Sequence, residues 1–254
     1  MIILKTRDEI AKMRLAGAVV AEILTILEEK IKPGTTTANL NAIAEYEARK
    51  RNAIPVFKNY PHHRGGRPFP GAICASINEE VVHGIPSHRE LKEGDIISID
   101  FGVLVNGFAG DAAITVPVGA VDEKAAKLIK VTEEALMLGI KQAVIGNRLG
   151  AISNAIQTHA EKNGFSVVRD FVGHGIGRKM HEDPPVPNYG RIDSGPVLKE
   201  GMTLAIEPML NVGTYKVFTK ADEWTVVTRD GSYSAHFEHT VAITDQGPEI
   251  LTLR

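Results

Sequence analysis

The sequence of 254 residues contains very little cysteine, a single residue at Cys74. One thiol excludes an internal disulfide and is typical of a protein kept in a reducing compartment. Positive charge is not in excess either, because 29 basic residues stand against 31 acidic ones and the net charge is -2. We therefore expect neither nucleic acid nor an anionic membrane surface as a partner.

Long apolar runs are also missing. No stretch approaches the roughly 20 apolar residues that a membrane-spanning helix needs. The first residues lack the apolar core of a secretion signal, since residues 1–4 are followed at once by Lys5 and three further charges. These absences favour a cytoplasmic protein. Because no linker or low-complexity segment divides the chain, we predict a single domain over residues 1–254.

The sequence does contain one pattern that occurs twice. The sequence LKEG at residues 91–94 recurs at residues 198–201, and in both copies a carboxylate stands six positions after the glycine, as Asp100 and Glu207. The strand period of two places each carboxylate on the same face as the small residue two positions earlier. A small neighbour leaves room for something bound to the carboxylate, which suggests a metal site built by gene duplication.

Other features recur in the same order. Asp111 and Glu238 each begin a run of strand-forming residues, and the sequence HGI occurs at residues 83–85 and again at residues 174–176. The helical stretches also match each other at a constant offset. Since only two copies of about a hundred residues exist, we predict duplicated halves related by a pseudo-twofold axis rather than stacked repeats.

Local signals predict the individual elements. Thr6 and Glu9 form a capping box that begins a helix running to Pro33. Further helices are predicted at residues 37–51, 123–144 and 149–162. Asn106 with Gly107 predicts a hairpin turn, and the Pro- and Gly-rich residues 61–71 predict a loop. Helices followed by strands, twice over, predict an α+β fold with helices outside a curved antiparallel sheet.

Four acids and one imidazole stand out as candidate metal ligands: Asp100, Asp111, His174, Glu207 and Glu238. An oxygen-rich set with one imidazole suits a pair of divalent ions such as Co, Mn, Fe(II) or Zn rather than a structural zinc site. Two divalent ions would balance four carboxylates that otherwise repel one another. The alternatives are surface acids paired with lysines and a histidine satisfied in the core. Acids are disfavoured in strands, which argues against the first alternative for a matched set.

Five motifs that follow one another in order carry a resemblance to a known family: NEEVVHGIP at residues 78–86, GFAGD at 107–111, GHGIG at 173–177, IEP at 206–208 and FEHT at 237–240. Over nearly its whole length the chain resembles the type I, bacterial-class methionine aminopeptidases, which are pita-bread metallopeptidases. The resemblance implies the pita-bread fold in a single catalytic metallopeptidase domain. It also implies removal of N-terminal methionine from nascent proteins and peptides when the second residue is small, by water that two divalent ions activate.

By this resemblance, Asp100, Asp111 and Glu238 would hold one ion. Asp111 and Glu238 would also bridge to a second ion, which His174 and Glu207 complete. The partners implied are the N-termini of nascent polypeptides, met by a monomer in the cytoplasm, and a transient contact with the ribosome is compatible with that role.

The resemblance assigns further roles at the substrate. Glu207 would shuttle a proton from water to the leaving amine, while His83 and His181 would contact the substrate or its tetrahedral intermediate. A pocket for an unbranched thioether needs apolar and aromatic walls. The residues that match the family's pocket are Tyr60, Phe69, Cys74, Met180 and Trp224.

The sequence departs from the family pattern in two places. Many relatives carry an aromatic residue where Met180 stands, and the loop at residues 61–68 is longer than usual, which affects the assignments of Tyr60 and Phe69. The 25 residues between His181 and Glu207 leave no space for the helical insertion of the type II enzymes. Two competing interpretations are a proline-specific peptidase of the same fold and a non-catalytic pita-bread module that binds peptides.

Overall fold

The computed structural model describes residues 1–62 and 65–253. Along the chain the elements are α1 (Arg7–Glu28), α2 (Thr37–Lys50), β1 (Ile54–Pro55), β2 (Cys74–Ile77), β3 (Glu80–Val82), β4 (Ile96–Val105), β5 (Phe108–Pro117), α3 (Glu123–Ile140), α4 (Leu149–Lys162), β6 (Ser166–Val167), β7 (Gly173–Gly175), β8 (Glu182–Val186), β9 (Thr203–Ile206), β10 (Met209–Asn211), β11 (Val217–Thr219), β12 (Val226–Thr228), β13 (Ser234–His236), β14 (Glu238–Thr244) and β15 (Gly247–Ile250). The predicted loop at residues 61–71 carries no helix or strand where it is described, and its residues 63–64 lie outside the described residues.

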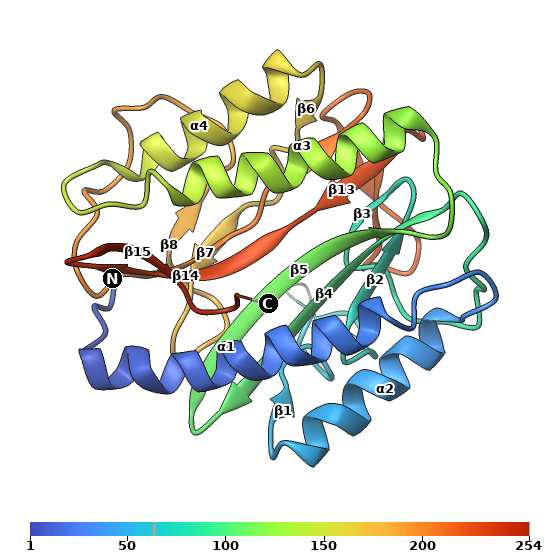
Figure 1. Ribbon diagram of the computed structural model, residues 1–254, viewed down its shortest axis with the longest axis horizontal. Coiled ribbons are helices and arrows are strands. Elements are labelled where there is room, and N and C mark those ends of the chain that lie inside the picture. The colour runs from blue at the N-terminus through green and yellow to red at the C-terminus, as the bar shows by residue number, and fades with distance from the viewer. Residues whose placement is uncertain (63–64, 254) are drawn as a thin grey trace.

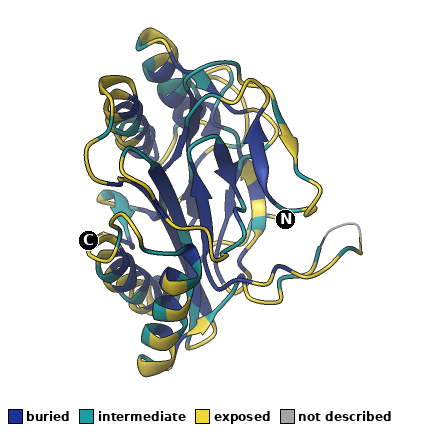
Figure 2. Ribbon diagram, turned by 90° about the vertical axis from the view of Figure 1, so that its right-hand side faces the viewer, coloured by how far each residue is buried: buried dark blue, intermediate teal, exposed yellow. Residues whose placement is uncertain are grey.

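The main sheet has the strand order β1-β4-β5-β14-β9-β7-β8, with β2 added to β4 and β15 to β14, and its pairs are antiparallel. Its central strands are related by a pseudo-twofold axis: β2, β4 and β5 from the first half of the chain correspond to β7, β9 and β14 from the second. Helices α1 and α2 lie along one edge of the view in Figure 1, and α3 and α4 along the opposite edge. The turned view shows these helices on one side of a curved, buried sheet (Figure 2). The predicted α+β pita-bread architecture is confirmed.

Matching hydrogen bonds confirm the predicted duplication. Before α2, the N–H of Gly34 donates to the carbonyl of Leu91 at 2.8 Å. Before α4, the N–H of Gly146 donates to the carbonyl of Leu198 at 3.1 Å. The two leucines are the first residues of the two LKEG sequences. In each half, the segment before the second helix is therefore hydrogen-bonded to that half's own copy of the motif.

Helix α1 begins where the capping box predicted, because the Thr6 side chain accepts from the N–H of Glu9 and the Glu9 side chain accepts from the N–H of Thr6. It ends at Glu28 instead of continuing to Pro33, since its buried face stops at Leu27 and the next three residues are exposed. Helix α3 stops at Ile140, before the predicted end at residue 144, although Ala143 beyond its end is still buried. Periodicity located both helices but did not predict their last residues.

The hairpin of β4 and β5 is longer than the sequence suggested. Asn106 and Gly107 both take positive φ values, 51° and 79°, in the tight turn that the sequence predicted. Pairing then extends over ten residues of each strand. Asp111 is consequently the fourth residue of β5 and not its first, so the expectation that this acid begins its strand is wrong. Glu238 does begin β14.

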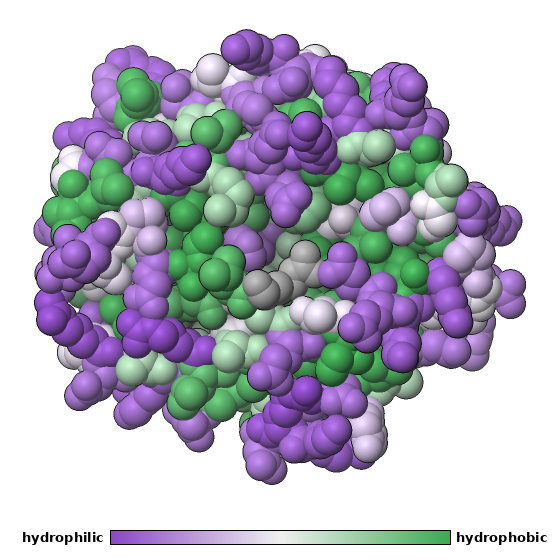
Figure 3. All heavy atoms as spheres, in the orientation of Figure 1, coloured by the Kyte–Doolittle hydropathy of each residue, from purple (hydrophilic) through white to green (hydrophobic). Residues whose placement is uncertain are grey.

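Helix α1 lies directly on β5 because Gly110 of β5 has no side chain: a Cβ there would come within 2.8 Å of the backbone of Ala16 and Gly17. Gly17 in turn leaves room for the C-terminal segment, since a Cβ on it would come within 2.0 Å of the Leu251 carbonyl. The face of the molecule seen in Figure 3 is mixed, with purple hydrophilic residues around its rim and green hydrophobic residues scattered between them. Along the described residues, no helix combines the length and apolar character that crossing a bilayer requires.

Candidate metal centre

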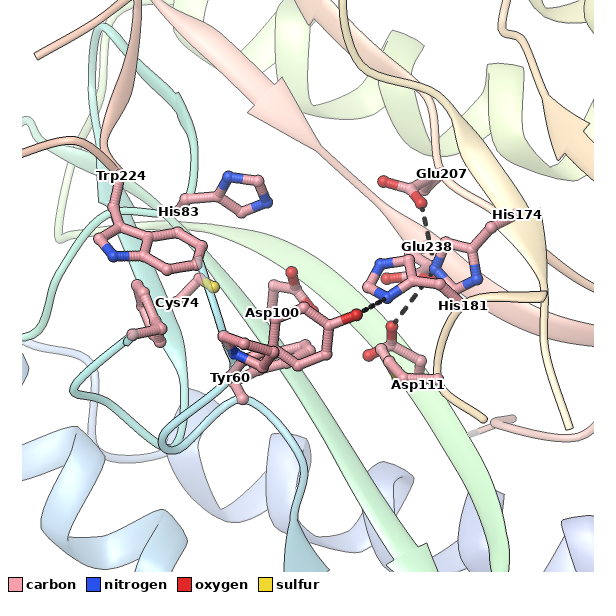
Figure 4. Close-up of a pocket in the computed structure, with 14 residues that line it drawn as sticks. Tyr60, Cys74, His83, Asp100, Asp111, His174, His181, Glu207, Trp224 and Glu238 are labelled. Atoms are coloured by element: carbon pink, nitrogen blue, oxygen red, sulfur yellow. Dashed lines mark hydrogen bonds and ion pairs between the residues drawn. The ribbon is translucent and has the colours of Figure 1, made fainter. Parts of the chain in front are cut away.

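One cavity of about 310 Å³ brings together all twelve side chains that the sequence singled out. Its lining consists of Phe57, Tyr60, Pro61, Phe69, Cys74, His83, Asp100, Asp111, His174, Met180, His181, Glu207, Trp224 and Glu238. Figure 4 shows Asp111, His174, Glu207 and Glu238 gathered at one end and Trp224 and Cys74 at the other, with Asp100 and Tyr60 between them. Phe57 and Pro61 are additions that the sequence analysis missed, both from the segment that follows β1.

The sheet register explains why the acids meet. Asp100 of β4, Ala113 of β5 and Glu238 of β14 are direct neighbours in a row across three strands. Partners in an antiparallel register share a face, so both carboxylates point to the same side, with small Ala113 leaving space between them. Asp111 lies two residues before Ala113 and shares that face. Glu207 follows β9, whose last residue pairs with the neighbour of Glu238.

His174 reaches the acids from the next strand, β7, where it lies opposite the small residue Ala205. Its Nε2 atom is 3.6 Å from Glu207 Oε1 and 4.0 Å from Asp111 Oδ2. One ligand atom each from Asp111, His174 and Glu238 lies within 4.8 Å of the others. Three adjacent strands and the residue after a fourth thus supply the acids, and a fifth strand supplies the imidazole.

Burial and mutual repulsion weaken the acidity of these carboxyl groups. Burial raises the pKa of Glu207 to about 8 and, with a further contribution from Glu207, that of Asp100 to about 7. The pKa values of Asp111 and Glu238 lie well above their ordinary range, first because of burial and then because of the neighbouring acids. Such raised values mean that the native fold holds four acids together without a compensating positive charge of its own.

The donor set fits a metal centre. Within the described residues, Asp100 Oδ1, Asp111 Oδ1 and Glu238 Oε1 are buried and have no hydrogen-bond partner. Burial lowers the pKa of His174 to about 3, and its Nδ1 donates to the carbonyl of Gly175 at 2.8 Å. The Nε2 atom that faces the acids therefore carries a lone pair. Buried oxygens without donors beside a neutral imidazole nitrogen are what divalent cations coordinate.

His83 also lines the cavity, and its backbone takes a left-handed conformation with φ of 59°. Backbone strain of this kind in a non-glycine residue is concentrated at functional sites. The residue after it, Gly84, has no room for a side chain, because a Cβ would lie 2.2 Å from the carbonyl of Ala75. The imidazole packs edge-on against Phe171 and Trp224, and burial lowers its pKa to about 4.

An apolar wall occupies the other end of the cavity. Trp224 packs edge-on against Phe69 and donates its indole N–H to the carbonyl of Arg67 at 2.8 Å, which ties the loop before β2 to the wall. Burial, with the nearby acids, raises the pKa of the Cys74 thiol well above its ordinary value, so the thiol is a neutral, apolar part of the lining. Met180 is buried in the same cluster.

His236 is a buried polar residue that the sequence analysis missed. It is 1% exposed, and its Nε2 lies 3.6 Å from Glu207 Oε2 without a hydrogen-bond partner among the described residues. The strand period could have found it, because His236 stands two positions before Glu238 in the sequence.

The comparisons with known proteins decide the family. The model of metallopeptidase family M24 matches residues 11–245. This chain belongs to metallopeptidase family M24. Its members' chemistry makes it a metal-dependent hydrolase, which agrees with the buried acids and imidazole. Over 254 residues the chain is 60% identical to a protein of Clostridium acetobutylicum named methionine aminopeptidase, covering all of this chain and 99% of that protein.

Solved structures agree with this assignment. A methionine aminopeptidase from Thermotoga maritima is 48% identical and superposes with a TM-score of 0.96 over the whole of both chains. A prolidase from Pyrococcus furiosus has a TM-score of 0.78 at 23% identity, and the match covers 99% of this chain but 66% of the prolidase. At that identity the likeness concerns the fold alone.

Proposed function

We propose that this protein removes the N-terminal methionine from polypeptides whose second residue is small. The observation that carries the proposal is a single cavity that joins four carboxyl groups and three imidazoles to an apolar, aromatic wall. The wall suits an unbranched thioether side chain, and the polar end suits the peptide bond beside it. The name of the relative from Clostridium acetobutylicum supports the same activity.

Two divalent ions would be held by the five candidate ligands, Asp100, Asp111, His174, Glu207 and Glu238, with Co, Mn, Fe(II) or Zn as candidates. When bound, they would supply the positive charge that lowers the pKa of water and polarises the scissile carbonyl. The orphaned oxygens of Asp100, Asp111 and Glu238 support this ligand set.

The remaining chemistry comes from side chains of the cavity. Glu207 would take a proton from water and return it to the leaving amine. His83 and His181 are neutral and can donate N–H groups to the oxygen on which negative charge develops. Tyr60, Phe69, Cys74, Met180 and Trp224 would enclose the methionine side chain.

We extend the proposal to the setting of the reaction. The chain would act as one catalytic domain over residues 1–254 and as a monomer in the cytoplasm, where new N-termini are made. Its substrates would be nascent chains, met during a transient contact with the ribosome. The near-neutral net charge of -2 supports the expectation that it binds neither nucleic acid nor membrane.

A peptide panel tests the activity. Protein stripped with a chelator and then supplied with Mn or Co is incubated with Met-Ala-Ser, Met-Lys-Ser and Ala-Pro-Ser, and released amino acids are measured. We expect methionine from the first peptide only. Release of alanine from Ala-Pro-Ser would favour a proline-specific peptidase, whose fold this chain shares, and release from no peptide at any metal concentration would favour a peptide-binding module.

A further inference from the structure

The hydroxyl of Tyr60 and the Nδ1 atom of His181 are 2.7 Å apart, although 121 residues separate them in the chain. The contact is drawn as a dashed line in Figure 4. Tyr60 belongs to the segment after β1, and His181 immediately precedes β8. Nothing in the proposed chemistry requires this contact, since Tyr60 enters it only as part of the apolar wall.

The backbone around Tyr60 is held in place by the returning part of the same loop. The N–H of Asn59 donates to the carbonyl of Phe69 at 2.8 Å, and the N–H of Phe69 donates to the carbonyl of Tyr60 at 3.0 Å. Phe69 in turn packs against Trp224. The phenol is therefore supported by the cavity wall and reaches His181 from a fixed position.

Chemistry decides which atom of this pair is the donor. A phenolic oxygen is a good donor and a weak acceptor, because its lone pair is delocalised into the ring. A neutral imidazole has one nitrogen that donates and one that accepts. The hydroxyl of Tyr60 then donates to Nδ1, and the proton of the His181 ring resides on Nε2.

His174 is the contrasting case, and its ring centroid is only 4.3 Å from that of His181. Its Nδ1 contacts the carbonyl of Gly175, which can only accept, so His174 carries its proton on Nδ1 and a lone pair on Nε2. The two adjacent imidazoles consequently have opposite tautomers. The lone pair on Nε2 of His174 points toward the acids, whereas the N–H at Nε2 of His181 is free to donate to a substrate oxygen.

We propose that Tyr60 is a positioning residue that holds His181 in its Nε2–H tautomer. This inference rests on the proposed function, because it gives His181 the task of donating to the oxygen of the scissile peptide. Without the hydroxyl, the ring of His181 would exchange between two tautomers, and only one of them presents an N–H at Nε2. Loss of such a supporting contact typically lowers activity about 10-fold.

The test is Tyr60→Phe in zinc-loaded, ¹⁵N-histidine-labelled protein, which is diamagnetic. Two-bond ¹H–¹⁵N correlation spectra distinguish protonated from bare ring nitrogens, and His181→Asn assigns the signals. In the parent we expect His181 protonated on Nε2 and His174 on Nδ1. In Tyr60→Phe we expect His181 to show averaged tautomers while His174 is unchanged. For Met-Ala-Ser, kcat should fall about 10-fold with KM changed by less than about twofold.

The matched control is Tyr46→Phe, which removes a hydroxyl from a tyrosine that is 61% exposed on α2. It should change neither the spectra nor the kinetics. A parent His181 protonated on Nδ1, or a Tyr60→Phe variant with unchanged tautomer or unchanged kcat, would overturn the inference. A parent that releases no methionine would instead remove the proposed function, while the spectra would still decide the tautomer of His181.

Discussion

Thr115 in β5 and Thr240 in β14 make the same pair of hydrogen bonds, each to a residue of the opposite half of the chain. The hydroxyl of Thr115 accepts from the N–H of His236 at 2.9 Å and donates to its carbonyl at 2.7 Å. The hydroxyl of Thr240 does the same with Asp111, at 3.0 and 2.8 Å. The threonines are therefore pseudo-twofold counterparts, and so are Asp111 and His236.

This register differs from the one that the sequence repeat suggested. The sequence pairs Asp111 with Glu238, but the counterpart of Glu238 in the structure is Ala113, the residue that it directly faces across β5 and β14. The pseudo-twofold axis passes between Glu238 and Ala113, so these two counterparts face each other. One carboxylate beside one methyl group fills that space, whereas two carboxylates would crowd and repel each other.

A similar difference separates the two histidine motifs. His174 lies opposite Ala205, and the residue in the same place of the first half is Ser76, which lies opposite Ser98. His83, which the sequence repeat matches to His174, follows β3 instead. Asp100 and Glu207 remain the one matched pair of candidate ligands. The two halves thus share one scaffold, while the candidate metal ligands differ between them.

The largest expected effect comes from substituting Glu207 or Asp100, the one matched pair of candidate ligands. Glu207→Gln should lower kcat/KM on Met-Ala-Ser about 1,000-fold, because the side chain is proposed to carry a proton as well as bind metal. Asp100→Asn should lose turnover through weaker metal binding, so excess Mn should restore part of it. Titrating each variant with Mn during the assay separates these cases. A near-normal rate for Glu207→Gln would remove Glu207 from the mechanism.

The acids of the two halves also predict a pH dependence of the metal-free protein. In the native state the pKa of Asp100 is about 7 and that of Glu207 about 8, against ordinary values near 4. Between those limits the native state binds more protons than the unfolded chain, so the free energy of unfolding falls as pH rises. Below pH 6.5 the buried histidines oppose this trend, because burial lowers the pKa of His174 and His83.

The pH interval in which the acids dominate the change in stability therefore extends from about 6.5 to about 8. Calorimetry should show the Tm of metal-free protein decreasing across it, whereas added Zn or Mn should raise the Tm most at the upper end, where the acids ionise readily. A Tm of the metal-free protein that is flat or rising over this interval would contradict the assigned burial of the acids.

The smallest effect belongs to the paired threonines. Thr115→Val and Thr240→Val each remove a hydroxyl and leave a buried N–H and carbonyl unpaired, which should cost about 1–3 kcal/mol of unfolding free energy in urea titrations. The variants should differ in metal affinity by calorimetric titration. Thr240→Val releases Asp111 and should weaken binding about 10-fold, while Thr115→Val releases His236 and should not. Equal losses of metal affinity in the two variants would mean that both threonines support the metal centre equally, which would contradict the difference between the halves.

Much of this molecule follows from local patterns. The capping box at Thr6, the turn at Asn106 and the positions of four helices depend on neighbours a few residues apart, so the sequence could predict them. The five candidate ligands were also recognisable, since acids in strands and an imidazole between glycines are unusual. The last residues of α1 and α3 were not, because apolar residues continue past both ends in the sequence.

The sequence by itself determined which side chains have the chemistry for a metal centre and which elements carry them. Only the tertiary structure decided that Ala113 separates Asp100 from Glu238, that Asp111 corresponds to His236, and that Tyr60 reaches His181. Strand register and contacts across more than a hundred residues depend on packing of the whole sheet, and a slip of two residues preserves the local pattern while changing every partner.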